Sequence, residues 1–304
     1  MSLPTLRQLQ YLVSVVDLKH FGHAAEQCFV TQSTLSASIQ DLESLLDAKL
    51  IERTNRKVLP TALGIEIAQR AQHILSLSAD LVDVVQSERS PSTGRVRIGV
   101  IPSICPFLLP KALAVIRQQL PQLDVILTED QSEPLVNKLK SGEIDVALLA
   151  FPFDIKALRH HIFGEESFWV ALPPNHPLAS QKQIVAEQLP IDELLLLSEG
   201  HCLREHALSA CQLPATTQRT SLQGTSLYTL IEMVAGGLGI TLIPEMAVNS
   251  DMVGHADICI RPLVAKNNNS SHKLGRELGL VWRPSYQRTQ TLELLSQAFA
   301  DALA

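Results

Sequence analysis

The chain has 304 residues, of which 46% are hydrophobic and 18% are charged, so it is long and apolar enough for two or three folded domains. This composition excludes a wholly disordered chain and a small scaffold held together by disulfides. The formal net charge is −6, and the first sixty residues carry no excess of positive charge, so charge gives no argument for nucleic-acid binding.

The longest uncharged apolar stretches are shorter than the roughly 18 residues of a membrane-spanning helix. Near the N-terminus, Asp17 interrupts the apolar pattern before any cleavage site typical of a signal peptide. We therefore expect a cytoplasmic protein without membrane contact. Because stable disulfides are rare in the cytoplasm, any pairing among its five cysteines is expected to be transient and regulatory.

Three helices are predicted in the first fifty residues. Thr5 and Gln8 fit a capping box, and apolar residues then recur at helical spacing. A short second helix is predicted over residues 22–28, and Thr31 suits the N-cap of a third. The order of helix, tight turn and helix is that of a helix-turn-helix. The buried stripe of the third helix is predicted to be Leu35, Ile39, Leu42 and Leu46.

Two parts of this region are candidates for DNA contact. The exposed face of the third helix carries short polar side chains that can approach base edges, although it has no Lys or Arg. Residues 50–59 then indicate a hairpin wing, two short apolar runs around a basic turn that suits phosphates. The candidate DNA-binding residues are Thr31, Gln32, Ser33, Thr34, Ser36, Arg53, Arg56 and Lys57.

Several short motifs of this region resemble those of the LysR-type transcriptional regulators. Members of that family carry an Ala-Ala pair, a Gln-x-x-x-Ser segment, a Leu-Glu pair and a wing that ends in Thr-x-x-Gly. The resemblance implies a winged helix-turn-helix that binds DNA over residues 1–60. In this chain the motifs are Ala24-Ala25, Gln32 to Ser36, Leu42-Glu43, Glu52 to Thr54 and Thr61 to Gly64.

A long helix is predicted over residues 61–88, which contain no proline. Ile67, Ile74 and Leu81 repeat at intervals of seven, as in a coiled coil. Such a helix would be about 40 Å long, more than one small domain covers, so we expect a linker helix that pairs with a second copy. The alternative is a helix packed on its own domain. Residues 89–94 are expected to form a hinge.

The fold class predicted from residue 95 onward is α/β. Predicted strands at 96–101, 124–127 and 145–150 alternate with helices at 110–120 and 133–141, which implies parallel strands. A second α/β unit comprises strands at 167–172, 239–244 and 279–282, a helix at 227–235 and a final helix.

The family resemblance implies how the strands and helices of this half are divided between lobes. Residues 95–304 would form a regulatory domain of two α/β lobes like those of periplasmic-binding proteins, with an effector between them. Lobe I would comprise about 95–163 and 271–304, and lobe II about 164–270.

The segment around Cys202 carries the clearest chemistry. His201 precedes Cys202 and Arg204 follows, and Gly200 suggests a loop that leads into a helix whose N-terminus favours an anion. All three influences favour the thiolate, which is the reactive form. Two alternatives stay open: Cys202 and Cys211 are ordinary buried residues, or they bind zinc together with His201 and His206.

The spacing of these two cysteines has a geometric consequence. If residues 202–211 form one continuous helix, nine steps of about 1.5 Å separate the two Cα atoms by about 13 Å, whereas a disulfide tolerates about 7 Å. A disulfide would therefore require the helix to unfold locally. Such a bond acts as a switch, because each redox state fixes a different local fold.

This segment, and motifs along essentially the whole chain, resemble the peroxide-sensing members of the LysR family. The resemblance implies that peroxide oxidises Cys202 to a sulfenic acid and that Cys211 resolves it as a reversible disulfide. Ser103 and Ser132 stand where the family usually has threonines, so they lack the methyl group that restricts the rotamer. The peroxide-pocket residues would be His201, Ser103, Ser132, Arg276 and Arg204.

The other candidate residues of the regulatory half are less specific. For Arg276 the alternative is a surface ion pair, because its alignment beside the loop at 267–269 is approximate. Cys28, Cys105 and Cys259 have no partner at useful spacing and are expected to be packing residues. Cys105 lies two residues after Ser103, a position from which it could line the same pocket.

The resemblance also implies partners. It describes a transcription activator of oxidative-stress genes, a homotetramer (dimer of dimers) on double-stranded promoter DNA, with hydrogen peroxide as its signal. RNA polymerase and a cellular thiol reductant would be further partners, and no cofactor, metal or enzyme activity is implied. One alternative is a LysR-type regulator of a small organic effector, whose response would survive Cys202→Ser. The other is a thiol peroxidase, which would turn over peroxide repeatedly.

Overall fold

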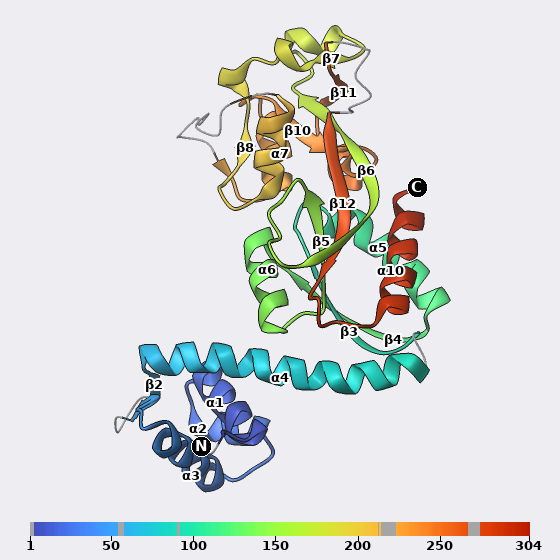
Figure 1. The fold of residues 1–304 in the computed structure, drawn as a ribbon. Coiled ribbons are helices and arrows are strands. Elements are labelled where there is room, and N and C mark those ends of the chain that lie inside the picture. Colours follow the sequence, from blue (N-terminus) through green and yellow to red (C-terminus); the bar gives the residue numbers. More distant parts are fainter. Residues whose placement is uncertain (1–2, 54–57, 90–91, 212, 214–222, 267–273) are drawn as a thin grey trace. The chain divides into compact units, whose positions relative to one another are not determined.

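The structure, a computed structural model, describes residues 3–53, 58–89, 92–211, 213, 223–266 and 274–304 (Figure 1). The chain divides into two compact units. The first unit holds residues 1–89 together with 138–143, and the second holds residues 90–137 and 144–304. No helix within the described ranges is both long and apolar enough to cross a membrane.

The first unit contains the three predicted helices, α1 (Leu6–Leu18), α2 (Phe21–Gln27) and α3 (Gln32–Leu46). The predicted capping box is present, since Thr5 Oγ1 accepts from the Gln8 N–H at 3.2 Å and Gln8 Oε1 accepts from the Thr5 N–H at 2.9 Å. The predicted buried stripe of α3 is confirmed at Leu35, Ile39 and Leu42, which are fully buried. It is wrong at Leu46, the last residue of the helix, which is 37% exposed.

The predicted wing is an antiparallel pair of strands, β1 (Ile51–Arg53) and β2 (Val58–Pro60). The buried carboxylate of Glu43 in α3 accepts from the Leu50 N–H at 2.8 Å and the Ile51 N–H at 3.1 Å. Burial raises the pKa of Glu43, but these hydrogen bonds and the Lys49 ammonium outweigh it and hold the pKa below its usual value. Glu43 therefore fixes the wing to α3 as a carboxylate.

The long helix predicted over residues 61–88 is α4 (Ala62–Arg89). Thr61 Oγ1 accepts from the Gly64 N–H at 2.9 Å at its start, and a Cβ on Gly64 would lie 2.0 Å from the Leu50 carbonyl oxygen. The Thr-x-x-Gly motif therefore lets the helix begin in close contact with the backbone before the wing. Further along α4 the exposed apolar side chains include Ile74, Leu77 and Leu81.

The second unit is built on one eight-stranded sheet, in the order β4-β3-β5-β12-β6-β11-β7, with β10 also paired to β6. Helices pack against it; α10 (Thr289–Leu303) lies beside α5 (Cys105–Gln119), and both are visible next to β6 and β12 in Figure 1. The α/β fold class is confirmed. The strands are β3 (Thr93–Val100), β4 (Gln122–Glu129), β5 (Val146–Phe151), β6 (Arg159–Leu172), β7 (Ile184–Val185), β10 (Thr241–Pro244), β11 (Cys259–Val264) and β12 (Gly275–Trp282).

The prediction of parallel strands is correct for only part of this sheet. Strand β3 runs parallel to β4 and β5, but β12 is antiparallel to β5 and β6, and β10 and β11 are antiparallel to β6. Residues 152–158 connect β5 to β6 without a helix, so the regular alternation that implies parallel neighbours ends there. Strand β12 then enters between β5 and β6 from a distant part of the chain.

The remaining helices and short strands follow one another along the regulatory half of the chain. The helix expected from residue 110 begins at Cys105, so Pro110 lies inside it, and α8 has the predicted bounds. The strand expected at 167–172 is the end of the 14-residue β6, which pairs with β12 over its first part and with β10 and β11 over its second. The other elements are α5 (Cys105–Gln119), α6 (Ser132–Ser141), η1 (Pro177–Ser180), η2 (Ala186–Gln188), η3 (Ile191–Glu193), β8 (Leu196–Leu197), α7 (Cys202–Ala210), β9 (Gln223–Gly224), α8 (Leu227–Ala235), η4 (Glu245–Ala247), α9 (Asp251–Gly254) and α10 (Thr289–Leu303).

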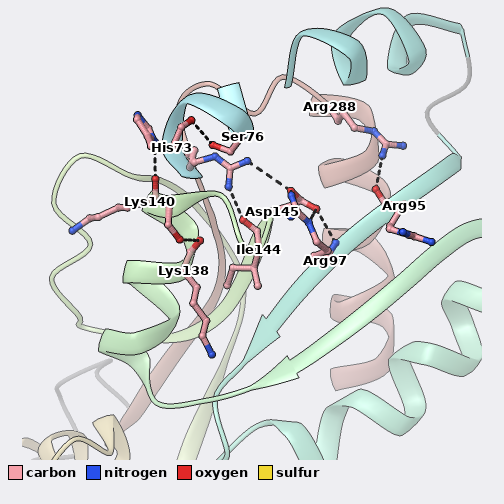
Figure 2. A network of polar contacts seen from close by, with 11 residues as sticks. His73, Ser76, Arg95, Arg97, Lys138, Lys140, Ile144, Asp145 and Arg288 are labelled. Carbon is pink, nitrogen blue, oxygen red and sulfur yellow. Dashed lines mark hydrogen bonds and ion pairs between the residues drawn. The ribbon is translucent and has the colours of Figure 1, made fainter. Parts of the chain in front are cut away.

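The buried carboxylate of Asp145 joins β3 to the residues that precede β5. Asp145 accepts from the Arg97 backbone N–H at 2.8 Å and from the Arg97 guanidinium, with Nη2 at 2.6 Å, as Figure 2 shows. Arg283, after β12, donates to the Ile144 carbonyl at 2.5 Å, and Arg288 donates to the Arg95 carbonyl at 3.1 Å. Charge-assisted contacts therefore hold β3, the entry to β5 and the end of β12 in fixed register.

Candidate functional site

A small cavity forms at the N-terminus of α7, where Cys202 is the first helical residue. Gly200 adopts φ +92°, a left-handed conformation that favours glycine, and turns the chain into the helix. The cavity volume is about 10 Å³, which corresponds to roughly one water-sized molecule. Its lining residues come from three segments of the chain, namely Ile101, Pro102, Ser103, Gln131, Ser132, Gly200, His201, Cys202 and Leu203.

The Cys202 thiol is buried, with 5% of the residue exposed. Burial raises its pKa, while the Arg276 guanidinium and the Ser132 hydroxyl act to lower it, and the net pKa stays above its usual value. Burial, which the charge pattern of the sequence does not show, thus opposes the thiolate that the sequence pattern favours. The cation that acts on the thiol is Arg276, from a strand far along the chain.

Arg276 is a buried residue and not a member of a surface ion pair. Its guanidinium donates from Nη1 to Ser103 Oγ at 2.7 Å and from Nη2 to the Ser103 carbonyl at 3.2 Å. On its other side Nε donates to Glu166 Oε1 at 2.8 Å, and neither side chain is more than 2% exposed. The arginine is thus held between a serine of the cavity wall and a buried carboxylate.

Both candidate serines line the cavity. Ser103 Oγ accepts from Arg276, which leaves its own proton free to be donated. Ser132 Oγ is buried, acts to lower the pKa of the Cys202 thiol, and has no hydrogen-bond partner of good geometry within the described part of the chain. Each hydroxyl can therefore bind a small polar ligand in the cavity.

The two candidate residues next to Cys202 have different positions. His201 lines the cavity and is half-buried, and burial lowers the pKa of its imidazole, which is therefore neutral near pH 7. Arg204 is buried in α7, and it does not belong to the lining residues given above. The structure thus brings together Cys202, His201, Ser103 and Ser132 around the cavity. Arg276 does not line the cavity, but its guanidinium donates to Ser103.

The second thiol lies at the other end of α7. Cys211 is the C-cap residue, is half-buried, and its N–H donates to the Ala207 carbonyl at 3.1 Å. Burial raises its pKa to about 11. The helix is continuous from Cys202 to Ala210, and both thiols are free. The condition under which the Cα atoms of Cys202 and Cys211 lie about 13 Å apart, one continuous helix between them, therefore holds.

From the sequence, His206 was a candidate only as a zinc ligand. It lies in the middle of α7, 4% exposed, and its Nε2 lies 2.9 Å from the Pro152 carbonyl, so Nε2 carries the proton. Burial lowers its pKa to about 4, with a smaller contribution from Arg276, although the hydrogen bond to Pro152 acts in the opposite direction. His206 therefore attaches α7 to the β5–β6 connection as a neutral ring.

The described residues offer no zinc site here, and Cys105 and Cys28 lie outside the cavity. Within the described residues no group of three or more His, Cys, Asp or Glu side chains is arranged to hold a metal ion. Cys105 does not line the cavity, and burial and Glu129 raise its pKa to about 12. Cys28 donates to Ser14 Oγ at 3.3 Å, in agreement with a packing role.

The candidate DNA-binding face of α3 is exposed at Gln32, Ser33 and Thr34, and half-buried at Ser36. Thr31 is the N-cap of the helix, since its hydroxyl accepts from the Thr34 N–H at 3.2 Å and bonds the Ser33 and Thr34 hydroxyls. Arg53 lies in β1. The two other candidate cations of the wing, Arg56 and Lys57, lie outside the described residues.

Comparisons with known proteins cover most of the chain. Residues 6–65 match the family "Bacterial regulatory helix-turn-helix protein, lysR family", and residues 89–304 match the family "LysR substrate binding domain". The chain is 41% identical to the HTH-type transcriptional regulator EstR of Acinetobacter baylyi, over 93% of this chain and 92% of that protein. It is 34% identical to the DNA-binding transcriptional dual regulator OxyR of Escherichia coli, over 96% and 94%. The solved structure of a full-length OxyR variant from Pseudomonas aeruginosa matches with a TM-score of 0.79 and 31% identity, over 98% of each chain.

Proposed function

The chain belongs to the LysR family of bacterial DNA-binding transcriptional regulators, and we propose that it senses hydrogen peroxide through a reversible Cys202–Cys211 disulfide. The observation that carries this proposal is the cavity at Cys202. It joins a thiol, two hydroxyls and an imidazole around space for one very small molecule. A polar site of that size suits peroxide and excludes any larger organic effector from the same position.

The chemistry balances within these two thiols. The Cys202 sulfur attacks one peroxide oxygen, the O–O bond breaks, and the departing hydroxide takes the thiol proton to form water. Cys202 is then a sulfenic acid. The Cys211 sulfur attacks the Cys202 sulfur, a second water leaves, and the disulfide forms. One peroxide is reduced and two thiols are oxidised in each cycle, and a cellular thiol reductant would restore both thiols.

The residues around the cavity have distinct parts in this proposal. Ser103 and Ser132 would bind the peroxide, and His201 would hydrogen-bond to the departing oxygen. Arg276, which donates to Ser103, would stabilise negative charge on the sulfur and on that oxygen. Serine retains the hydroxyl donor and acceptor of the threonines usual in the family, so the substitution leaves this chemistry intact.

The disulfide would act on DNA binding through the fold. We assign residues 1–60 to double-stranded DNA, with α3 toward base edges and the wing toward phosphates. Residues 61–88 would join two copies through the exposed apolar side chains of α4, and pairs of dimers would form a tetramer at a promoter, where RNA polymerase is a further partner. Formation of the bond requires α7 to unfold locally, which would change how the regulatory domains pack.

The experiment that tests this function uses the reduced full-length protein and one equivalent of hydrogen peroxide. We expect rapid formation of a Cys202–Cys211 disulfide in peptide mass spectrometry and a changed DNase footprint on a promoter fragment. Repeated turnover of peroxide with a thiol reductant, without a change of footprint, would favour a peroxidase instead. Both thiols remaining reduced would overturn the proposal.

A second candidate function is the response to a small organic effector. A groove of about 540 Å³ between β6, β12 and α10 has the size of known small-molecule sites, and Phe163, Leu280, Trp282 and Leu292 contribute to its walls. The relative at 41% identity has a name, EstR, that does not mention peroxide. If a Cys202→Ser variant still regulated its target promoter fully in cells, the organic-effector function would be favoured over peroxide sensing.

A further inference from the structure

We propose that Glu166 is a positioning residue of the peroxide reaction, which holds the Arg276 guanidinium against the cavity wall. This inference rests on the proposed function of the Cys202 site. Glu166 is 3% exposed and carries a charge that the sequence alone connects with no chemistry. A buried carboxylate is expensive unless its partners are specific, so its contacts indicate what it does.

The position of Glu166 is fixed by the sheet. It lies directly opposite Arg276 in the antiparallel pairing of β6 with β12, with Nε of the arginine 2.8 Å from Oε1. Because the Nε contact fixes one edge of the planar guanidinium, the other two nitrogens are directed toward Ser103, at 2.7 Å and 3.2 Å. Glu166 therefore determines which edge of the arginine faces the cavity.

The second oxygen of Glu166 explains why the residue is a carboxylate. Oε2 accepts from the Met246 N–H of η4 at 3.2 Å, so the two oxygens face two donors from different segments. A glutamine offers one acceptor and places an NH₂ group at the other position, where it meets a donor. An isosteric amide thus cannot satisfy both contacts, and the Arg276 side chain loses part of its support.

The effect on the reaction goes through Arg276, since Glu166 does not line the cavity. The positive charge of Arg276 favours the Cys202 thiolate, and this influence depends on distance and direction. A Glu166 that only neutralised the arginine would oppose the thiolate, so its removal would make Cys202 more acidic. A Glu166 that positions the arginine has the opposite effect, and the sign of the change separates the two roles.

The test compares Glu166→Gln with the matched control Glu165→Gln, which changes an exposed glutamate on the same strand. Iodoacetamide labelling of each cysteine is followed by mass spectrometry as a function of pH, and the rate of disulfide formation is measured with peroxide. We expect Glu166→Gln to raise the apparent pKa of Cys202 and to slow disulfide formation about ten-fold, as for loss of a charge-assisted hydrogen bond. Cys211 labelling and the Glu165→Gln profile should match the unmodified protein.

A conservative variant completes the design. Glu166→Asp keeps both acceptors on a shorter side chain, so its rate should fall between those of Glu166→Gln and the unmodified protein, and it provides the measurement if Glu166→Gln does not fold. A lower Cys202 pKa, or a rate equal to that of Glu165→Gln, would overturn the inference. Absence of any peroxide-driven disulfide in the unmodified protein would instead refute the proposed function, while the labelling profile would still measure the role of Glu166.

Discussion

Cys202 and Cys211 lie at opposite ends of the same helix, and burial raises the pKa of both thiols. They differ in what surrounds the sulfur. At Cys202 a guanidinium and a hydroxyl oppose the effect of burial, whereas at Cys211 burial acts without such groups. Burial therefore does not distinguish the thiol that we propose attacks peroxide from the one that we propose resolves it, whereas the Arg276 guanidinium and the Ser132 hydroxyl beside Cys202 do.

The largest predicted effect follows from removing either thiol. Cys202→Ser should abolish oxidation by one equivalent of peroxide, because Cys211 does not line the cavity in which we propose that peroxide binds. Cys211→Ser should keep the first step and accumulate sulfenic acid at Cys202, which dimedone labelling and mass spectrometry detect. A dimedone adduct at Cys211 in the Cys202→Ser variant would reverse the assignment of the two ends.

The second prediction concerns His206, between the two thiols. Its folded-state pKa of about 4 lies below the usual 6.5, so its contribution to stability is present above pH 6.5 and is lost as pH falls through about 4. The free energy of unfolding of the reduced protein should decrease over this range by roughly 3 kcal/mol from this residue. Urea unfolding between pH 7 and 4 measures it.

The control for this effect is His206→Gln, which can still donate to the Pro152 carbonyl but does not titrate. The difference between the two pH curves isolates His206 from the other nine histidines. Parallel curves would show that the ring is not held neutral in the folded protein.

A smaller effect is expected at Ser132. Ser132→Ala removes the hydroxyl that lies against the Cys202 sulfur, so the Cys202 pKa should rise and its labelling by iodoacetamide at pH 8 should slow about ten-fold. Cys211 in the same sample serves as the internal reference, because its surroundings do not change. Equal slowing at both thiols would indicate a general change of the fold and contradict the local explanation.

The smallest prediction tests whether α7 must unfold. Ser209 is an exposed residue of α7, where alanine favours the helix over glycine by about 1 kcal/mol. Condensation of the Cys202 sulfenic acid with Cys211 should therefore be about five-fold faster in Ser209→Gly than in Ser209→Ala. Stopped-flow measurement after a fast peroxide pulse separates this step from the first oxidation. Identical rates would mean that the thiols meet without local unfolding.

The sequence predicts structure best where the signals are local. Thr5, Thr31 and the apolar stripe of α3 act within one or two turns of helix, so the DNA-binding unit follows the prediction closely. The spacing of Cys202 and Cys211 likewise lies within a single element. The antiparallel entry of β12 depends on pairing with a distant strand, and no local pattern expresses such a pairing.

The candidate site shows the same division. Cys202, His201, Ser103 and Ser132 were predictable as candidates from motifs, and the structure places them around one cavity. The contact between Glu166 and Arg276 joins residues 110 positions apart, and it follows from the register of two strands. Arg204 was a candidate because it is near Cys202 in the sequence, but helical geometry directs neighbouring side chains to different faces.

Gly200 would give the proposed switch a further property. The left-handed turn at this residue begins α7 beside the cavity, and glycine loses more conformational freedom on ordering than any other residue. Once the helix has unfolded and the disulfide has later been reduced, the chain has to recover this one conformation before a new cavity exists. In the proposed cycle the protein would therefore remain insensitive for a period after its thiols are restored, and the duration of the signal would depend on refolding as well as on the reductant.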